Sequence, residues 1–283
     1  MIKNKLFTII LPTYKREEKL INAVESIKKQ THDNWRVIIL NDSPDWNYKK
    51  FEEEYLPNEK IIYLKNEKNV GKNAELNIAL DYLEKEKRDT NSKEYITFLD
   101  DDDWFDERAI ENMNKITEEY PKNKWFISNR AMRDNTTITR FRKNTREHFN
   151  KKNLDYATNY WIFKKMIGDA TMLLDSETAF KRRFSKKIKN GEEWLYFSIL
   201  PEKKFLYYNF NSTISDGYLL DGITKNYNSK LDRVKNTLIL AKELFNNKLF
   251  NFWHFVYFPL RIGSILIKPK RAQIRFVEEI TKK

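Results

Sequence analysis

The stretch that decides the fold is LFTIILPTY at residues 6–14, followed by a helix-like segment and then by RVIILNDS at residues 36–43. The runs Leu6–Leu11 and Arg36–Leu40 are short and rich in Ile and Val, which is typical of strands. Between them, residues 17–29 place apolar side chains three and four positions apart, which is helical spacing. This order predicts two parallel strands joined by a right-handed crossover.

The same pattern repeats along the chain. Further strand-like runs lie at Ile61–Leu64 and Tyr95–Leu99, and a helix-like stretch between them runs from Lys72 to about Glu84. A helix that begins after a capping Asp106 and a strand at 125–128 extend the pattern. We therefore predict an α/β fold with a Rossmann-like, mostly parallel sheet flanked by helices. Such sheets bind their ligands beyond the carboxyl ends of the strands.

The alternation weakens after residue 128. Residues 129–157 are polar and basic and are expected to form an excursion or loop, and a compact order resumes at 171–174. A long helix-like segment at 231–245 marks a helical C-terminal region.

Composition sets the class of protein. Apolar residues make up 40% of the 283 and charged residues 33%, as in a soluble globular protein. The absence of cysteine excludes disulfides, thiolate metal sites and a catalytic thiol, and it suits a reducing cytosol. No leader-like segment precedes the first strand, so secretion is not expected.

The charge and the apolar residues of the second half suggest a surface for a partner. The net charge is +12, and all of the excess lies in residues 151–283, which hold 25 basic and 13 acidic side chains. Nucleic acid, anionic lipid and phosphorylated substrates all fit this charge. The apolar stretch at 250–267 contains His254, Pro259 and Arg261, so it could lie on a membrane but not cross one.

Polar residues follow the predicted strands where a ligand is expected. They are Pro12, Thr13 and Tyr14 after the first strand, 41–43 after the second, and the acidic run Asp100 to Asp103. Carboxylates at a strand end suit Mg²⁺ or Mn²⁺, which take one or two carboxylates together with substrate phosphates. A solvated acidic turn before a helix is the alternative interpretation of this run.

Several ordered motifs resemble one family. FTIILPTYKREE at 7–18, SIKKQT at 26–31, IILNDS at 38–43, NVGKNAELN at 69–77 and FLDDDDW at 98–104 are similar to the opening of family 2 glycosyltransferases. The resemblance covers roughly the first 120 residues. It implies the GT-A fold and a nucleotide-sugar donor, usually UDP-linked, with inversion at the transferred sugar.

The resemblance also implies roles for particular residues. Pro12, Thr13 and Tyr14 would surround the base and Asp42 would bond to it, while the motifs add Arg16, Asn69 and Lys72 as donor contacts. The family's D-x-D element maps onto Asp100 and Asp102 as ligands of Mn²⁺ or Mg²⁺, with Asp102 the principal ligand. Asp100 or Asp101 would approach the ribose or the metal shell. A shift of one residue, to Asp101 and Asp103, fits the same pattern.

Two further assignments come from the family. NGEEWL at 190–195 resembles the segment that carries the catalytic base, which assigns the base to Glu193 and a supporting role to Glu192. Without the resemblance to the family, this pair would be interpreted as the acidic first turn of a helix. Many relatives have Arg where this chain has Leu76, and Lys72 is the residue that could replace it. Asp216 or Asp221 could supply a third metal ligand.

The expected organisation follows. Residues 1–225 would form the GT-A catalytic domain, with a donor-binding half at 1–120 and an acceptor-facing half at 121–225. Residues 226–283 would form a helical, basic and aromatic region that contacts a membrane or forms a homo-oligomer. The acceptor would be a saccharide, a glycoprotein or a lipid-linked glycan, and the protein would be cytoplasmic or at the inner face of a membrane.

Two other functions compete with sugar transfer. A non-catalytic relative would bind the nucleotide only. A basic nucleic-acid-binding protein would explain the charge, but it would leave Asp42, the four aspartates and Glu193 without a role. No nucleic acid partner is therefore expected.

Overall fold

The computed structural model describes residues 5–86, 92–141, 146–156, 159–160, 165–186, 192–216, 229–250 and 252–267. The chain forms two compact units. The first consists of Met1–Phe184 and Leu200–Ser215, and the second of Ser185–Ile199 and Asp216–Lys283. Each unit is thus built from two separate pieces of chain. The domain boundary predicted between residues 225 and 226 lies outside the described residues.

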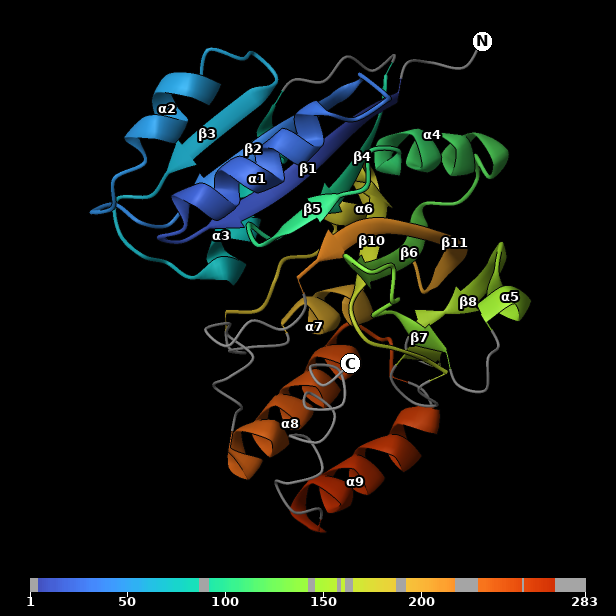
Figure 1. Cartoon of the computed structure of the whole chain (residues 1–283). Helices are drawn as coiled ribbons and strands as arrows, with labels where there is room; N and C mark the ends of the chain where they lie inside the picture. The colour runs from blue at the N-terminus through green and yellow to red at the C-terminus, as the bar shows by residue number, and fades with distance from the viewer. Residues whose placement is uncertain are drawn as a thin grey trace. The chain divides into compact units, whose positions relative to one another are not determined.

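A nine-stranded sheet forms the centre of the first unit, in the order β3-β2-β1-β4-β10-β6-β11-β5, with β8 paired to β11 (Figure 1). Its strands are β1 Lys5–Thr13, β2 Trp35–Asn41, β3 Ile61–Lys65, β4 Lys93–Phe98, β5 Asp103–Phe105, β6 Trp125–Met132, β8 Lys152–Asp155, β10 Ala170–Asp175 and β11 Lys204–Ser215. Two short strands, β7 (Arg140–Phe141) and β9 (Met166–Ile167), pair separately.

The N-terminal half of the sheet is parallel, because β1 pairs with β2 and β4, and β2 with β3, in the same direction. The crossovers contain α1 (Glu17–Lys28), α2 (Lys49–Tyr55) and α3 (Lys72–Lys85). One face of β1 buries Phe7, Ile9 and Leu11 in a core that includes residues of α1 and of α4 (Ala109–Glu119). Alternate side chains point to the other face, and α3 contacts β1 and β2. Strands covered on both faces need continuous apolar runs.

The rest of the sheet is mixed. Strand β10 runs antiparallel to both β4 and β6, whereas β11 is parallel to β6 and antiparallel to β5 and β8. Helix α6 (Ser176–Phe180) follows β10, and the Asp175 carboxylate caps it by accepting from the Thr178 N–H at 2.8 Å. The predicted α/β class is confirmed, including its parallel half.

Two local expectations were wrong, and helix α2 was not foreseen. The helix after Asp106 begins at Ala109, and Asp106 accepts from the Arg108 N–H at 2.9 Å instead of capping the helix. Residues 129–157 are not a plain excursion, because β6 continues to Met132, α5 spans Arg146–Phe149 and β8 pairs with β11.

The second unit contains α7 (Glu192–Ile199), α8 (Lys230–Asn246) and α9 (Phe252–Ile267). A capping box of Ser229 and Asp232 starts α8. Helices α8 and α9 pack on each other, and the predicted helical C-terminal part is confirmed. None of the helices in the described part of the chain has the length and hydropathy of a membrane-spanning segment.

Candidate functional site

The loops after β1, β2 and β4 meet at one edge of the sheet. They meet because these strands are parallel neighbours, with Thr13 in register with Asn41 and Ile10 with Phe98. The Lys15 N–H donates to the Ser43 Oγ at 2.8 Å and links the first two loops. Three of the segments singled out in the sequence are therefore brought together.

The four aspartates after β4 alternate between burial and partial exposure. Asp101 and Asp103 are 6% and 3% exposed, whereas Asp100 and Asp102 are half-buried. One carboxylate oxygen from each of Asp100, Asp102 and Asp103 lies within 4.8 Å of the others. Of the two D-x-D registers, the pair Asp100 and Asp102 is thus the more accessible one.

Each aspartate of the run has at least one polar or cationic partner. The Thr13 Oγ1 donates to Asp101 at 2.8 Å, and the Arg16 Nη1 contacts Asp101 at 3.1 Å and Asp102 at 3.2 Å. The Lys72 Nζ lies 2.6 Å from Asp100. Arg130, on β6, lies 2.7 Å from Asp103 through its Nη2. Three cationic side chains from three elements or loops therefore face four carboxylates.

Burial and these cations shift the pKa values of the carboxyl groups in opposite directions. Burial raises the pKa of Asp101 to about 6 in spite of Arg16 and Thr13. Burial also raises the pKa of Asp103 to about 8, and the neighbouring Asp100 and Asp102 add to the effect of burial. Burial would raise the pKa of Asp100 too, but Lys72, Arg130 and Arg16 outweigh it and hold that pKa below its ordinary value. Negative charge is thus favoured at Asp100.

Asp42 lies at the end of β2 and is 1% exposed. Its carboxylate accepts from the Asn66 Nδ2 at 2.9 Å, from the Val70 N–H at 2.8 Å and from the Gly71 N–H at 2.7 Å. These bonds fix the loop between β3 and α3, in which the predicted Asn69 is exposed. In this structure Asp42 thus positions the residues before Lys72, and its contact with a base stays a prediction.

Two aromatic side chains remain exposed at this edge. Tyr14 and Trp46 are each 45% exposed, and the Lys15 ammonium lies 5.2 Å and 5.8 Å from the centres of their rings. Exposed aromatic faces suit stacking on a base or a sugar. Pro12 and Thr13, by contrast, are buried.

Comparisons with known proteins agree with this geometry. The model of the family "Glycosyl transferase family 2" matches residues 8–182. The chain belongs to this family.

The relatives support the same fold. Glycosyltransferase GlyA of Streptococcus pneumoniae is 31% identical over 121 residues, which are 42% of this chain and 16% of GlyA. TarS 1–349 of S. aureus, solved with UDP-GlcNAc, has a TM-score of 0.64 and 14% identity, covering 85% of this chain and 67% of TarS 1–349. The mannosyltransferase PcManGT of Pyrobaculum calidifontis, solved with GDP-Man and Mn²⁺, has a TM-score of 0.57 and 10% identity over 97% of this chain and 79% of that one. The chain therefore has the GT-A fold. It spans less than two fifths of the length of the curated relatives that it matches.

The position at which many relatives carry Arg is occupied by a buried side chain in this protein. Leu76 is 1% exposed. Lys72, one turn earlier, is half-buried and reaches Asp100. That Lys72 takes the place of the family's Arg stays a prediction.

The predicted catalytic pair lies in the second unit. Glu192 and Glu193 are the first two residues of α7, but their side chains are outside the described part of the structure. Of the suggested third ligands, Asp216 follows β11 and is exposed, and Asp221 lies outside the described residues. The roles of all four stay predictions.

Several residues at this edge were not predicted from the sequence. Tyr48 accepts from the Arg16 N–H at 3.1 Å and lies 3.2 Å from the Thr13 Oγ1, and Arg130 and Glu75 also belong to this edge. Glu75 is 3% exposed, and its Oε1 has no hydrogen-bond partner among the residues that the structure describes. Burial, with Asp42 and Asp101 nearby, raises the pKa of Glu75 to about 9. Its place within NVGKNAELN was the available signal.

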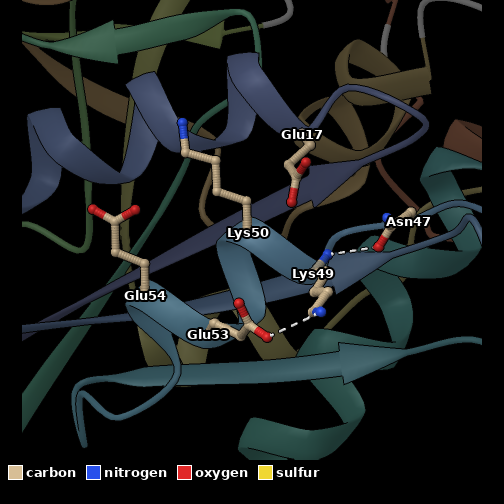
Figure 2. Close-up of a pocket in the computed structure, with 6 residues that line it drawn as sticks. All are labelled: Glu17, Asn47, Lys49, Lys50, Glu53 and Glu54. Atoms are coloured by element: carbon tan, nitrogen blue, oxygen red, sulfur yellow. Dashed lines mark hydrogen bonds and ion pairs between the residues drawn. The ribbon is translucent and has the colours of Figure 1, made fainter.

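A separate hollow of about 550 Å³ lies between α1 and α2 (Figure 2). Its lining carries charges of both signs. Lys49 and Glu53 form an ion pair at 3.6 Å, and the Glu17 carboxylate accepts from the Phe51 N–H at 2.9 Å. None of the strand-end residues lines it. We place the candidate site at the acidic run instead, because potential metal-binding carboxylates and cationic side chains lie close together there.

Proposed function

We propose that this family 2 glycosyltransferase moves a hexose or N-acetylhexosamine from a UDP-linked donor to a hydroxyl group, with inversion at the anomeric carbon. The observation that carries the proposal is the acidic run, in which Asp100 and Asp102 stay accessible while Asp101 and Asp103 are buried. The acceptor would be a saccharide, a glycoprotein or a lipid-linked glycan.

The residues at the strand ends would bind the donor. Tyr14 offers an exposed ring for the base, and Asp42 holds the loop that carries Asn69. Lys72 and Arg16 present their cations beside the acidic run, where they would contact the donor diphosphate. TarS solved with UDP-GlcNAc and PcManGT solved with GDP-Man support a nucleotide-sugar donor for this fold.

The same carboxylates fit a divalent cation. Hard oxygen atoms are the ligands that Mg²⁺ and Mn²⁺ prefer, and those of Asp100 and Asp102 belong to the cluster within 4.8 Å. Asp103 also belongs to it but is buried and pairs with Arg130, so Asp102 and Asp100 would hold the ion. When bound, the ion supplies positive charge that stabilises the departing diphosphate. PcManGT, solved with Mn²⁺, supports this cofactor.

Glu193 would act as the base. In a single displacement, the acceptor oxygen attacks the anomeric carbon as the bond from that carbon to the diphosphate oxygen breaks. Glu193 accepts the proton of the acceptor hydroxyl, and Glu192 would orient the acceptor. Both residues lie in the first turn of α7.

The test is metal-dependent hydrolysis or transfer with a panel of nucleotide sugars. We expect one UDP-sugar to be turned over only with Mn²⁺ or Mg²⁺. Asp102→Ala should lower this rate by at least about a hundredfold, the scale for losing charge stabilisation of a transition state. Asp33→Ala is the matched control, because the Asp33 side chain is exposed and forms an ion pair with Lys60 on the surface.

Two outcomes would contradict the proposal. Full metal-dependent activity in Asp102→Ala would exclude Asp102 as the ligand. UDP binding without turnover of any nucleotide sugar would favour the non-catalytic alternative.

A further inference from the structure

Helix α9 carries apolar side chains on two opposite faces. One face packs inside the second unit, where His254, Phe258 and Ile265 are 3%, 5% and 2% exposed. The other face, here called the α9 outer face, is exposed. It consists of Phe252, Phe255, Val256, Leu260, Leu266 and Ile267.

The α9 outer face is a continuous stripe. With 3.6 residues per turn, its six side chains fall within an arc of about 140°. The exposed fractions run from 41% for Val256 to 82% for Ile267. Pro259 and Gly263 also project into this arc, and no charged residue does. A single exposed leucine is ordinary, but a contiguous apolar stripe of this kind usually marks a binding surface.

The dimensions favour a helix that lies on a surface. Helix α9 has 16 residues, which gives a length of about 24 Å at 1.5 Å per residue. The hydrocarbon core of a bilayer is about 30 Å thick, so this helix is too short to cross it. An apolar face on a helix of this length is suited to burial at the level of lipid headgroups.

The charge distinguishes between two occupants of this face. A second copy of the chain is the competing partner, because α8 also exposes Leu231, Leu238 and Phe245, seven residues apart. Residues 229–283, however, hold 12 basic and 4 acidic side chains. Two such regions repel one another, whereas an anionic surface attracts each of them. The charge is therefore complementary to acidic lipid.

We propose that the α9 outer face is a docking surface for an anionic lipid bilayer, into which its phenylalanine and leucine side chains insert, while the excess positive charge of residues 229–283 attracts the lipid phosphates. This surface lies in the second unit, and it does not depend on the identity of the donor sugar. It would bring an acceptor carried on a lipid within reach of the enzyme.

Vesicle co-sedimentation of the full chain tests this surface. We expect the protein to sediment with phosphatidylcholine vesicles that contain phosphatidylglycerol, to bind pure phosphatidylcholine more weakly, and to be released by salt. The double variant Phe255→Ser, Leu260→Ser should bind the mixed vesicles at least about tenfold more weakly. The reason is that burial of each of these apolar side chains in the bilayer increases the affinity by about tenfold or more. Tyr82→Ser, at an exposed aromatic of α3 in the first unit, should bind as the wild type does.

Two further measurements make the result decisive. Donor hydrolysis without vesicles should be equal in wild type and double variant, which shows that the variant is folded and separates this proposal from the proposed activity. Light scattering should give equal masses for both proteins in solution. No binding of the wild type to mixed vesicles, or equal binding of the double variant, would overturn the proposal. A lower mass for the double variant would overturn it in favour of a second copy.

Discussion

Four consecutive carboxylates are stable at residues 100–103 because cationic side chains from other segments face them. Like charges at this spacing repel, yet Lys72, Arg16 and Arg130 lie within 2.6 to 3.2 Å of Asp100, Asp102 and Asp103 respectively. The same cations compete with a metal for these oxygens. A donor diphosphate would relieve the competition, because it offers Lys72 and Arg16 other partners.

Glu75 shows the cost of placing one more carboxyl group near this cluster. It lies on the first turns of α3 and is 3% exposed. Because burial is the main cause of its raised pKa of about 9, the folded protein holds this side chain as the neutral acid at neutral pH. An ionised Glu75 would add charge beside Asp42 and Asp101.

Glu75→Gln therefore has a predictable effect on stability against pH. The pKa of Glu75 is about 9 when folded, against an ordinary 4.5, so its favourable contribution is complete below pH 4.5. This contribution is lost progressively as the pH rises to 9, because the unfolded chain then releases a proton that the folded one retains. The slope from this group is up to about 1.4 kcal/mol per pH unit.

Urea unfolding at several pH values within this window measures the difference. Glu75→Gln should have the shallower decline of unfolding free energy with pH, because it cannot ionise. Asp101 and Asp103 also have raised pKa values, but they act equally in both proteins. Equal slopes would mean that Glu75 is charged in the folded protein.

At the scale of the element, the start of α3 connects the fold to the site. Gly71 precedes the helix with a φ of +83°, a conformation that side chains with a Cβ rarely adopt. Its N–H donates to Asp42 at 2.7 Å, and the next residue is Lys72. The end of β2 thus determines where the cation at the helix start lies.

The elements that the sequence predicts well are those with a local signal. The apolar runs of β1, β2 and β4 and the spacing in α1 and α3 identify them without tertiary information. The pairing of strand β11 has no such signal, since its neighbours β6, β5 and β8 are far away in the chain. Helix α2 has seven residues, of which only Phe51 and Tyr55 are buried. Two buried side chains are too few to show the periodicity of a helix.

The candidate site divides in the same way. Tyr14, Asp42 and Asp100–Asp103 could be predicted to lie together because they follow parallel strands. Arg130 could not, because its contact with Asp103 depends on β6 lying beyond β10. The burial of Asp101 and the exposure of Asp102 were equally inaccessible, because they depend on the direction of each side chain in a turn.

Helix α7 is the element on which the proposed base depends. Glu193→Gln keeps the size of the side chain but removes the base, so we expect a loss of about 10²- to 10⁴-fold in kcat, the range for general base catalysis. UDP affinity should not change, because proton transfer plays no part in donor binding. Steady-state transfer rates and calorimetric UDP titration measure the two effects.

The adjacent residue provides the comparison. Glu192→Gln should lose less activity and should raise KM for the acceptor instead. A larger loss in Glu192→Gln than in Glu193→Gln would exchange the two roles.

At the scale of the whole molecule, the two units are interleaved along the chain. The first unit takes β11 from Leu200–Ser215, after the chain has contributed Ser185–Ile199 to the second. Strand β11 pairs with three others, β6, β5 and β8. The sheet is thus incomplete until residues beyond α7 are present, although its parallel half lies within the first hundred residues.

This interleaving predicts different outcomes for two truncations. A chain ending at residue 184 lacks β11 and leaves the hydrogen-bonding groups of three strands without their partner, and each buried unpaired group costs about 1–3 kcal/mol. The loss of several such bonds, together with the buried side chains of β11, is comparable to the usual stability of a domain, about 5–15 kcal/mol, so we expect no folded protein. A chain ending at residue 216 keeps all nine strands of the sheet and should bind UDP with unchanged affinity. Circular dichroism and UDP titration of both chains would show this difference. Loss of folding in both would mean that the first unit needs α8 and α9 for its stability.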